Sequence, residues 1–417
     1  MMPSLQKKYV PYSDWRFQTI GEVTEKFMSG GTPSTKNPEY WTGNIPWTTS
    51  APMTSFYLDH GECMISKEGL EKSASNLVPK NNVLISTRVG IGKVVVNRID
   101  IAISQDITGV ILDKTRIIPD FFVWTLLSRK YSLLLKGMSR GTTIKGLIRS
   151  ELERFTIPLP PLPEQRRIAA ILSTVDDALQ RSRQAALETE RLKAGVMQEL
   201  MTKGIGHTEF REDPDVGWIP KEWGVKKLGE ISDIVSGGTP SRNEAKFWNG
   251  NIPWIKTGEI NYNIIYNTEE KITLEGFKNS AARLIPKDTL LMALYGQGVT
   301  RGRVAITGIE ATINQACAAM LFTEKVETRF IFYFLTREYN SIRSLSGGAN
   351  QNNLNIPLIK SVSIALPPIT EQQKIATILS TIDCKLSLQR QRTAHYEKIR
   401  QGLMNDLLTG RKRVKVT

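Results

Sequence analysis

The 417-residue chain is an internal duplication, and this repeat limits the folds that it can adopt. The segment "SGGTPSTKNPEYWTGNIPW" at 29–47 recurs as "SGGTPSRNEAKFWNGNIPW" at 236–254, an offset of 207 residues. The segment "LPPLPEQRRIAAILSTVD" at 159–176 recurs as "LPPITEQQKIATILSTID" at 366–383 with the same offset of 207. Self-similarity at one fixed period is the signature of tandem structural units. The chain therefore consists of two units with the same elements in the same order.

Between these shared segments, the copies diverge in glycine-rich loops that carry basic residues. "NNVLISTRVGIGKVVV" at 81–96 corresponds to "DTLLMALYGQGVTRGRVAI" at 288–306, which has 19 residues against 16. Duplication of a generic stable domain gives no reason for divergence to concentrate in such loops. The pattern indicates two related binding domains that recognise different targets.

Each unit is expected to contain a mixed α/β part followed by a wholly helical part. Short β-branched runs such as "NVLIS" and "GRVAI" alternate with turn signals and one helical stretch in the first part. The helical part follows a proline cluster. The predicted fold class is α+β (mixed α/β), a pseudo-two-fold tandem repeat. The predicted boundaries are 1–158 and 211–365 for the two α/β domains, and 159–210 and 366–417 for the two helical regions.

The helical parts begin at matched places. Pro163 and Glu164 suit a first helical turn, because proline loses no hydrogen bond there and a carboxylate meets exposed N–H groups. In the second copy, Thr370 and Gln373 have capping-box spacing. The first helix is expected to continue to the glycines at 204 and 206, about 40 residues or roughly 60 Å.

Both helices carry an apolar stripe. The matching stripes predict that the helices pair as an antiparallel coiled coil, while packing against each unit's own α/β part remains the alternative. The first stripe is interrupted near Ser182 and Thr189, which leaves a kink or break open. The stripe residues are Ile168, Ile171, Leu172, Val175 and Leu179 in the first helix, and Ile375, Ile378, Leu379, Ile382 and Leu386 in the second.

The charge balance favours polyanionic partners. The chain has 55 Lys and Arg against 41 Asp and Glu, a formal charge of +14. Such an excess biases the surface potential toward nucleic acid, although solvated basic faces alone can produce it. The three cysteines form no C-x-x-C pair, and neither a signal peptide nor an apolar run of about 18 residues is present. We therefore expect a cytoplasmic protein.

Catalytic motifs are missing or incomplete. "GIGKV" lacks the first glycine and the hydroxyl residue of a P-loop, and "YGQGVTRG" has arginine where a dinucleotide fingerprint needs glycine. The double prolines follow leucine, which does not fit an amino-methyltransferase motif. A nuclease pattern built from Pro214, Asp215, Glu244 and Lys246 is loose, but it keeps a metal-dependent nuclease open as an alternative. No catalytic residue, metal site or cofactor is predicted for this chain.

With no catalytic motif in the sequence, the remaining candidate residues are those suited to binding. Reading duplex DNA requires Lys and Arg for phosphates, together with Arg, Lys and short polar side chains that reach base edges. The divergent loops contain these residue types, and their glycines let the backbone approach a phosphate. The tryptophans shared by both copies are interpreted as core. The predicted DNA contacts are Thr48, Thr49, Arg88, Lys93, Arg140 and Lys145 in the first copy, and Lys256, Thr257, Tyr295, Arg301, Arg303, Asn350 and Gln351 in the second.

The doubled "GGTPS…W…GxIPW" segment, the doubled "LPPLxEQ+xIAxILSxxD" helix start and the "GxMxxLLTG" helix end form a specific combination. Together they resemble the specificity subunit of a type I restriction-modification system. The resemblance covers essentially the whole chain, and both copies carry all three elements in the same order.

The resemblance implies two target-recognition domains, each reading one half of a bipartite double-stranded DNA site, separated by helices that act as a ruler. Half-sites about one helical turn apart follow from the spacing of dimer-like readers. It also implies that the chain is not itself an enzyme. Adenine methylation from S-adenosylmethionine belongs to two modification subunits, and ATP- and magnesium-dependent translocation and cleavage belong to restriction subunits. A helical scaffold without a DNA role is the remaining alternative.

Overall fold

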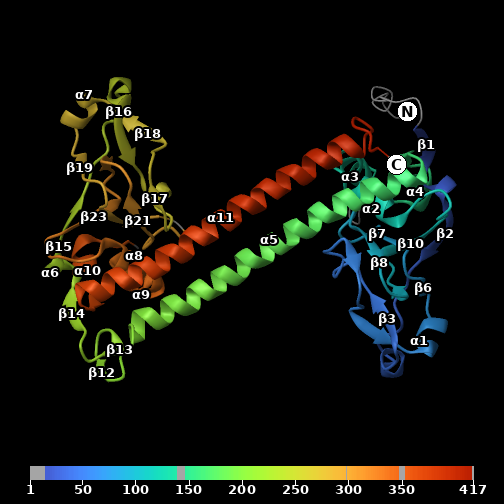
Figure 1. Cartoon of the computed structure of the whole chain (residues 1–417), viewed down its shortest axis with the longest axis horizontal. Helices are drawn as coiled ribbons and strands as arrows, with labels where there is room; N and C mark the ends of the chain where they lie inside the picture. The colour runs from blue at the N-terminus through green and yellow to red at the C-terminus, as the bar shows by residue number, and fades with distance from the viewer. Residues whose placement is uncertain (1–14, 139–145, 297, 347–352, 416–417) are drawn as a thin grey trace. The chain divides into compact units, whose positions relative to one another are not determined.

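The computed structural model describes residues 15–138, 146–296, 298–346 and 353–415. The chain divides into two compact units (Figure 1). The first unit comprises Met1–Arg183 with Gln391–Thr417, and the second comprises Gln184–Arg390. Each unit therefore combines one α/β domain with parts of both long helices. Within the described ranges, no helix has the length and apolarity needed to cross a membrane.

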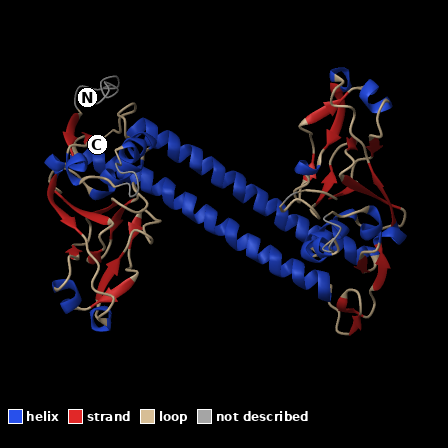
Figure 2. Ribbon diagram, turned by 180° about the vertical axis from the view of Figure 1, so that it is seen from behind, coloured by secondary structure: helices blue, strands red, loops and turns tan. Residues whose placement is uncertain are grey.

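The α/β domain of the first unit contains two main sheets (Figures 1 and 2). Its pairings are antiparallel except for β4 with β8 and β3 with β9, which are parallel. The five-stranded sheet has the order β2 (Thr24–Ser29), β10 (Ile107–Leu112), β7 (Val83–Ser86), β8 (Val94–Asn97) and β4 (Tyr57–Leu58). The four-stranded sheet has the order β5 (Cys63–Ile65), β3 (Ile45–Thr48), β9 (Ile101–Ile103) and β6 (Asn76–Val78).

Helices and a closing strand pair complete this domain. The strand β1 (Arg16–Thr19) pairs antiparallel with β11 (Thr156–Leu159). The first and last strands of the domain therefore lie side by side. The α2 segment is mostly apolar, and it is buried from Phe121 to Leu126. The helices are η2 (Gly21–Val23), η3 (Pro38–Trp41), α1 (Lys67–Glu71), α2 (Pro119–Leu127), α3 (Arg129–Gly137) and α4 (Arg149–Glu153).

The second unit repeats this plan strand for strand. Its sheets have the orders β15-β23-β20-β21-β17 and β18-β16-β22-β19, and β14 pairs with β24. The strands are β14 (Gly224–Lys227), β15 (Ser232–Ser236), β16 (Trp248–Ile255), β17 (Ile264–Ile265), β18 (Glu270–Ile272), β19 (Arg283–Ile285), β20 (Leu290–Ala293), β21 (Val304–Thr307), β22 (Ala311–Ile313), β23 (Cys317–Phe322) and β24 (Ser363–Leu366).

The helices of the second α/β domain follow the same order, and a hairpin of β12 (Phe210–Asp213) and β13 (Gly217–Pro220) precedes the domain. The helices are α6 (Leu228–Ile231), η4 (Ala245–Phe247), η5 (Thr257–Glu259), α7 (Leu274–Lys278), α8 (Thr328–Arg337), α9 (Tyr339–Ser344) and α10 (Ile356–Lys360). The mixed α/β fold and its duplication are therefore confirmed.

The shared "GGTP" and tryptophan segments form an identical structural frame in both domains. The rings of Trp41 and Trp47 meet edge to face with centroids 5.2 Å apart, as do those of Trp248 and Trp254. The Trp47 indole donates to the Gly31 carbonyl at 3.1 Å, and the Trp254 indole donates to that of Gly238 at 3.0 Å. Trp47 and Trp254 are buried and their partners half-buried, so the interpretation as core is confirmed.

The long helices are α5 (Leu162–Lys203) and α11 (Ile369–Leu407). Pro163 and Glu164 lie in the first turn of α5, as predicted. The α11 helix begins one residue before Thr370, so the expected capping role of that threonine is wrong. The α5 helix continues without a break past Ser182, and the Ser182 hydroxyl hydrogen-bonds the Thr393 hydroxyl at 2.9 Å.

The two long helices pack antiparallel within each unit. In the first unit, Arg400 Nη1 lies 2.5 Å from Asp176 Oδ1, and Arg183 forms an ion pair with Glu397. In the second unit, Lys193 pairs with Asp383 at 2.6 Å, and Arg390 pairs with Glu190 at 2.6 Å. In both, residues later in α5 meet residues earlier in α11, which defines an antiparallel pair.

The predicted apolar stripes do not face each other. The stripe containing Ile168 and Leu172 shares a core with α2 of its own domain and with the last turns of α11, including Leu407. The stripe containing Ile375 shares a core with α8 and with the end of α5. Each stripe thus packs on its own α/β domain and on the opposite end of the other helix. Ile378, a predicted member of the second stripe, is 40% exposed.

Candidate nucleic-acid interface

Three sequence segments meet at one end of the five-stranded sheet in the first unit. The β7–β8 loop, residues 86–93, is here called the first hairpin loop. The Ser50 hydroxyl, just after β3, donates to the Val89 carbonyl at 3.0 Å, which joins the segment 48–50 to this loop. The Leu147 amide donates to the Thr87 carbonyl at 2.8 Å, so the segment that follows residues 139–145 reaches the same place.

The predicted contacts in these segments have different surroundings. Arg88 is exposed, whereas Thr48 is buried and its hydroxyl donates to the Thr49 carbonyl at 2.9 Å. The Thr49 hydroxyl donates to Glu62 Oε2 at 2.5 Å. The Lys93 ammonium donates to the Ser50 carbonyl at 2.8 Å and therefore fastens the loop from within. Arg140 and Lys145 lie outside the described residues.

Glycines shape the first hairpin loop. Gly90 has φ +65° and Gly92 has φ +89°, a region that side chains with a Cβ rarely adopt. The Ser86 hydroxyl donates to the Gly90 carbonyl at 2.5 Å, and the Lys93 amide donates to the same carbonyl at 3.2 Å. The loop is therefore a tight turn that extends from the end of β7 and β8.

The second unit brings the corresponding segments together. Here the β20–β21 connection contains residues 298–303, called the second hairpin loop. Arg303 Nη1 donates to Asn261 Oδ1 at 2.7 Å, which links this loop to the segment after β16. The Leu354 amide donates to the Leu294 carbonyl at 3.1 Å, so the segment after residues 347–352 also returns here. Asn350 and Gln351 lie outside the described residues.

The predicted contacts of the second unit also differ in exposure. Tyr295 is 41% exposed beside the loop, and Thr257, Arg301 and Arg303 are half-buried. The Lys256 ammonium lies 2.7 Å from Glu269 Oε2, and this hydrogen bond raises the pKa of Lys256. A carboxylate of the same domain therefore already neutralises this ammonium.

Glu270, close to Lys256, also binds an arginine of the repeated tryptophan segment. Arg242 donates to both oxygens of Glu270, at 2.5 and 3.2 Å, and its guanidinium lies 3.7 Å from the Trp248 ring centre. The Arg242 hydrogen bond holds the pKa of Glu270 below its usual value. Glu270 thus holds Arg242 in place beside the Trp248 ring.

Sequence reasoning missed two residues that hold the second hairpin loop. Arg343 and Tyr339 of α9 donate hydrogen bonds to its backbone carbonyls. The corresponding helix of the first copy, α3, carries Lys136 beside the first hairpin loop. The available signal was therefore a basic residue near the end of this helix in both copies.

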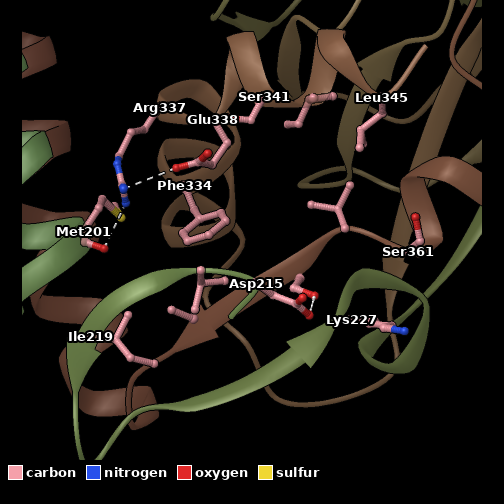
Figure 3. Close-up of a pocket in the computed structure, with 15 residues that line it drawn as sticks. Met201, Asp215, Ile219, Lys227, Phe334, Arg337, Glu338, Ser341, Leu345 and Ser361 are labelled. Carbon is pink, nitrogen blue, oxygen red and sulfur yellow. Dashed lines mark hydrogen bonds and ion pairs between the residues drawn. The ribbon is translucent and has the colours of Figure 1, made fainter. Parts of the chain in front are cut away.

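The nuclease pattern has no support among the described side chains. Asp215 lines a cavity of about 440 Å³ (Figure 3), but its Oδ2 accepts a hydrogen bond from the Ser363 hydroxyl at 2.8 Å. Arg337 in the same cavity donates to the Met201 carbonyl at 3.1 Å. Lys246 pairs with Glu275 at 2.6 Å. In the ranges that the structure describes, no group of three His, Cys, Asp or Glu is placed to hold a metal ion.

Two repeated α/β domains with divergent basic loops, joined to antiparallel helices, define a tandem protein with two related candidate binding domains. The type I restriction modification DNA specificity domain matches the chain twice, at residues 12–189 and 220–398. The chain therefore belongs to the family of type I restriction-modification specificity subunits, which recognise DNA target sequences.

Relatives of this family match almost the whole chain. The type I restriction enzyme MjaVIII specificity subunit of Methanocaldococcus jannaschii is 28% identical over 412 residues, covering 96% of this chain and 94% of that protein. The MjaIX specificity subunit of the same organism is 26% identical over 411 residues, covering 96% and 94%. The crystal structure of a type I S subunit from M. genitalium matches with a TM-score of 0.64 at 16% identity, covering 97% and 98%. These likenesses support neither the nuclease nor the scaffold alternative.

Proposed function

We propose that the chain recognises a bipartite duplex DNA site, with each α/β domain reading one half. One observation carries this proposal: the loops that diverge between the copies are the loops that the fold gathers at one end of each five-stranded sheet. The frame beneath them is the same in both domains. A common frame with different loops suits two readers of different half-sites.

We propose that Arg88 and Lys93, with Arg140 and Lys145, serve the first half-site, and that Tyr295, Arg301 and Arg303 serve the second. The same assignment includes Thr48, Thr49, Lys256, Thr257, Asn350 and Gln351. Arg88 and Tyr295 are supported by their exposure. Lys93 and Lys256 have protein partners, so their effect on DNA binding includes the shape of the loops that they hold.

We propose that catalysis lies in partner subunits of a cytoplasmic complex. Modification subunits would methylate adenine from S-adenosylmethionine, and restriction subunits would use ATP and magnesium. Membership of the family supports this division of roles. A solved structure that matches with a TM-score of 0.54 at 18% identity concerns complex assembly of a type I restriction-modification system. The antiparallel helices would set the spacing of the half-sites and dock the modification subunits.

Adenine-methylation mapping by single-molecule sequencing tests the proposal. DNA is compared from cells with and without this chain, with the modification subunits present and active in both. We expect one bipartite motif with a fixed gap to appear only with the chain. Absence of any chain-dependent motif would reject the bipartite specificity role and return the scaffold and nuclease alternatives to consideration.

A further inference from the structure

The second hairpin loop is bound along its backbone by two side chains of α9. Arg343 Nη2 donates to the Gly298 carbonyl at 2.8 Å, and Arg343 Nη1 donates to the Arg301 carbonyl at 3.1 Å. The Tyr339 hydroxyl donates to the Val299 carbonyl at 2.5 Å, and it accepts from Arg343 Nη1 at 2.9 Å. Three carbonyls within four consecutive residues are thus fixed from one helix.

A second layer of contacts supports these two side chains. The Tyr262 ring packs edge to face on the Tyr339 ring, with centroids 6.0 Å apart. The Arg303 guanidinium lies 5.6 Å from the centre of the Tyr262 ring. Gly302 has φ +85°, and a Cβ added there would lie 3.2 Å from Arg343 Cγ. The loop therefore follows the Arg343 side chain closely.

The chemistry of arginine suits this position. Its planar guanidinium carries several N–H donors in a rigid fork, so one side chain binds two carbonyls that lie in different directions. A lysine ammonium has the same charge but no such fork. Arg343 is half-buried, and its Nη1 and Nη2 atoms both donate to carbonyls of the second hairpin loop.

The first unit has a lysine where the second has Arg343. A Cβ added to Gly92 of the first hairpin loop would lie 3.4 Å from Lys136 Cε of α3, as one added to Gly302 would lie 3.2 Å from Arg343 Cγ. Ser50 and Lys93 also fasten the first hairpin loop. The second unit therefore carries a planar guanidinium fork at the position where the first carries an ammonium.

We propose that Arg343, supported by Tyr339, is a positioning residue that sets the conformation of the second hairpin loop and thereby the sequence read by the second domain. Arg343 acts through the loop and does not contact DNA. The inference rests on the proposed function for its effect on recognition. A loop held in its bound conformation loses less entropy on binding, so the clamp supports affinity and selectivity together.

Hydrogen exchange on the full chain tests the clamp without DNA. Arg343→Gln removes the fork, and Tyr339→Phe removes only the hydroxyl. We expect backbone amides of the second hairpin loop to exchange about ten-fold faster in Arg343→Gln, as loss of hydrogen bonds to a charged group predicts. The first hairpin loop should not change. Arg329→Gln is the matched control, because Arg329 is an exposed arginine at the start of α8.

Selection from randomised duplex DNA tests the effect on recognition, using the chain with its modification subunits. Arg343→Gln should keep the first half-site and the gap, while preference within the second half-site falls roughly ten-fold. The salt dependence of binding should not change, because no phosphate contact is lost. Arg343→Lys should resemble Arg343→Gln, whereas Arg329→Gln should select the original site.

The outcomes separate the two proposals. Unchanged exchange of the second hairpin loop in Arg343→Gln would overturn the clamp. Faster exchange with equal loss at both half-sites, or with a shallower salt dependence, would overturn the positioning role. If the unaltered chain selects no bipartite sequence, the proposed function fails, while the exchange result still decides whether Arg343 holds the loop.

Discussion

At the scale of single residues, Lys93 and Arg343 hold the two hairpin loops by donating hydrogen bonds to backbone carbonyls. The basic and glycine-rich composition of the hairpin loops was visible in the sequence. The internal use of Lys93 was not, because its acceptors are backbone carbonyls of a segment 42 and 43 residues away. Arg343 was missed for the same reason, since its acceptors lie about 40 residues earlier in the chain.

Two arginines provide a reciprocal test of half-site assignment. Arg88→Ala is expected to weaken recognition of the first half-site, and Arg301→Ala that of the second. Loss of one base contact or phosphate contact corresponds to roughly 1–3 kcal/mol of binding free energy. Binding is measured on duplexes in which one half-site at a time is scrambled. Equal losses at both half-sites for either variant would contradict the assignment.

A buried carboxylate at the start of α5 is expected to stabilise the first unit. Glu164 is 2% exposed, accepts from Arg413 at 2.7 and 2.8 Å, and accepts from the Trp15 indole at 3.2 Å. Glu164→Gln should lower the free energy of unfolding by about 1–3 kcal/mol, because it weakens charge-assisted hydrogen bonds in a buried site. Urea denaturation measures this.

The control for that substitution is Glu71→Gln, which removes an exposed ion pair with Lys67. It should change the free energy of unfolding by less than about 1 kcal/mol. Equal effects of the two substitutions would show that the buried Glu164 network contributes no more than a surface pair.

The Tyr262 phenol behind the second hairpin loop is expected to titrate late. Burial is the main cause that raises the pKa of Tyr262 to about 12. The unfolded phenol ionises near pH 10, so the contribution of this residue to stability is constant below pH 10 and is lost between about pH 10 and 12. Difference titration of phenolate absorbance between the original chain and Tyr262→Phe measures the folded value. A difference midpoint at pH 10 would contradict burial of this ring.

At the level of elements, the sequence predicted the bounds of the first long helix well, because prolines precede it and glycines follow it. Its interrupted apolar stripe left a break near Ser182 open, and the helix has none there. Periodicity did not predict which surface each apolar stripe packs against. Two equal stripes suggest that they meet, yet an antiparallel register brings the start of one helix to the end of the other, so Ile168 shares a core with Leu407. Periodicity also could not predict the order of the strands within each sheet, because that order depends on crossovers between distant strands.

The frame glycines give an element-scale prediction. A Cβ on Gly238 would lie within 2.8 Å of three atoms of Ala281 and Ala282. Gly238→Ala should therefore destabilise the second domain by about 1–3 kcal/mol, as other forms of overpacking do. Gly258→Ala is the control, because nothing lies within 4 Å of an added Cβ there. Denaturant unfolding compares the two, and similar midpoints would show that the frame adjusts at Gly238.

At the level of the whole molecule, the repeat in the sequence predicted the tandem architecture and the class of ligand. It did not predict the compact units, because each one contains part of the other copy's long helix. The first unit takes its last segment, Gln391–Thr417, from the far end of the chain. The boundaries of the sequence repeats therefore differ from the boundaries of the compact structural units.

The paired strands that begin and end each α/β domain have a consequence for how such proteins diversify. In both domains the chain enters on one strand and leaves on its direct neighbour, β1 beside β11 and β14 beside β24. Because the two ends of each domain lie side by side, another domain with the same pair of end strands could replace it without changing the distance between the segments that it joins. We expect such an exchange to leave the helices and the other domain as they are.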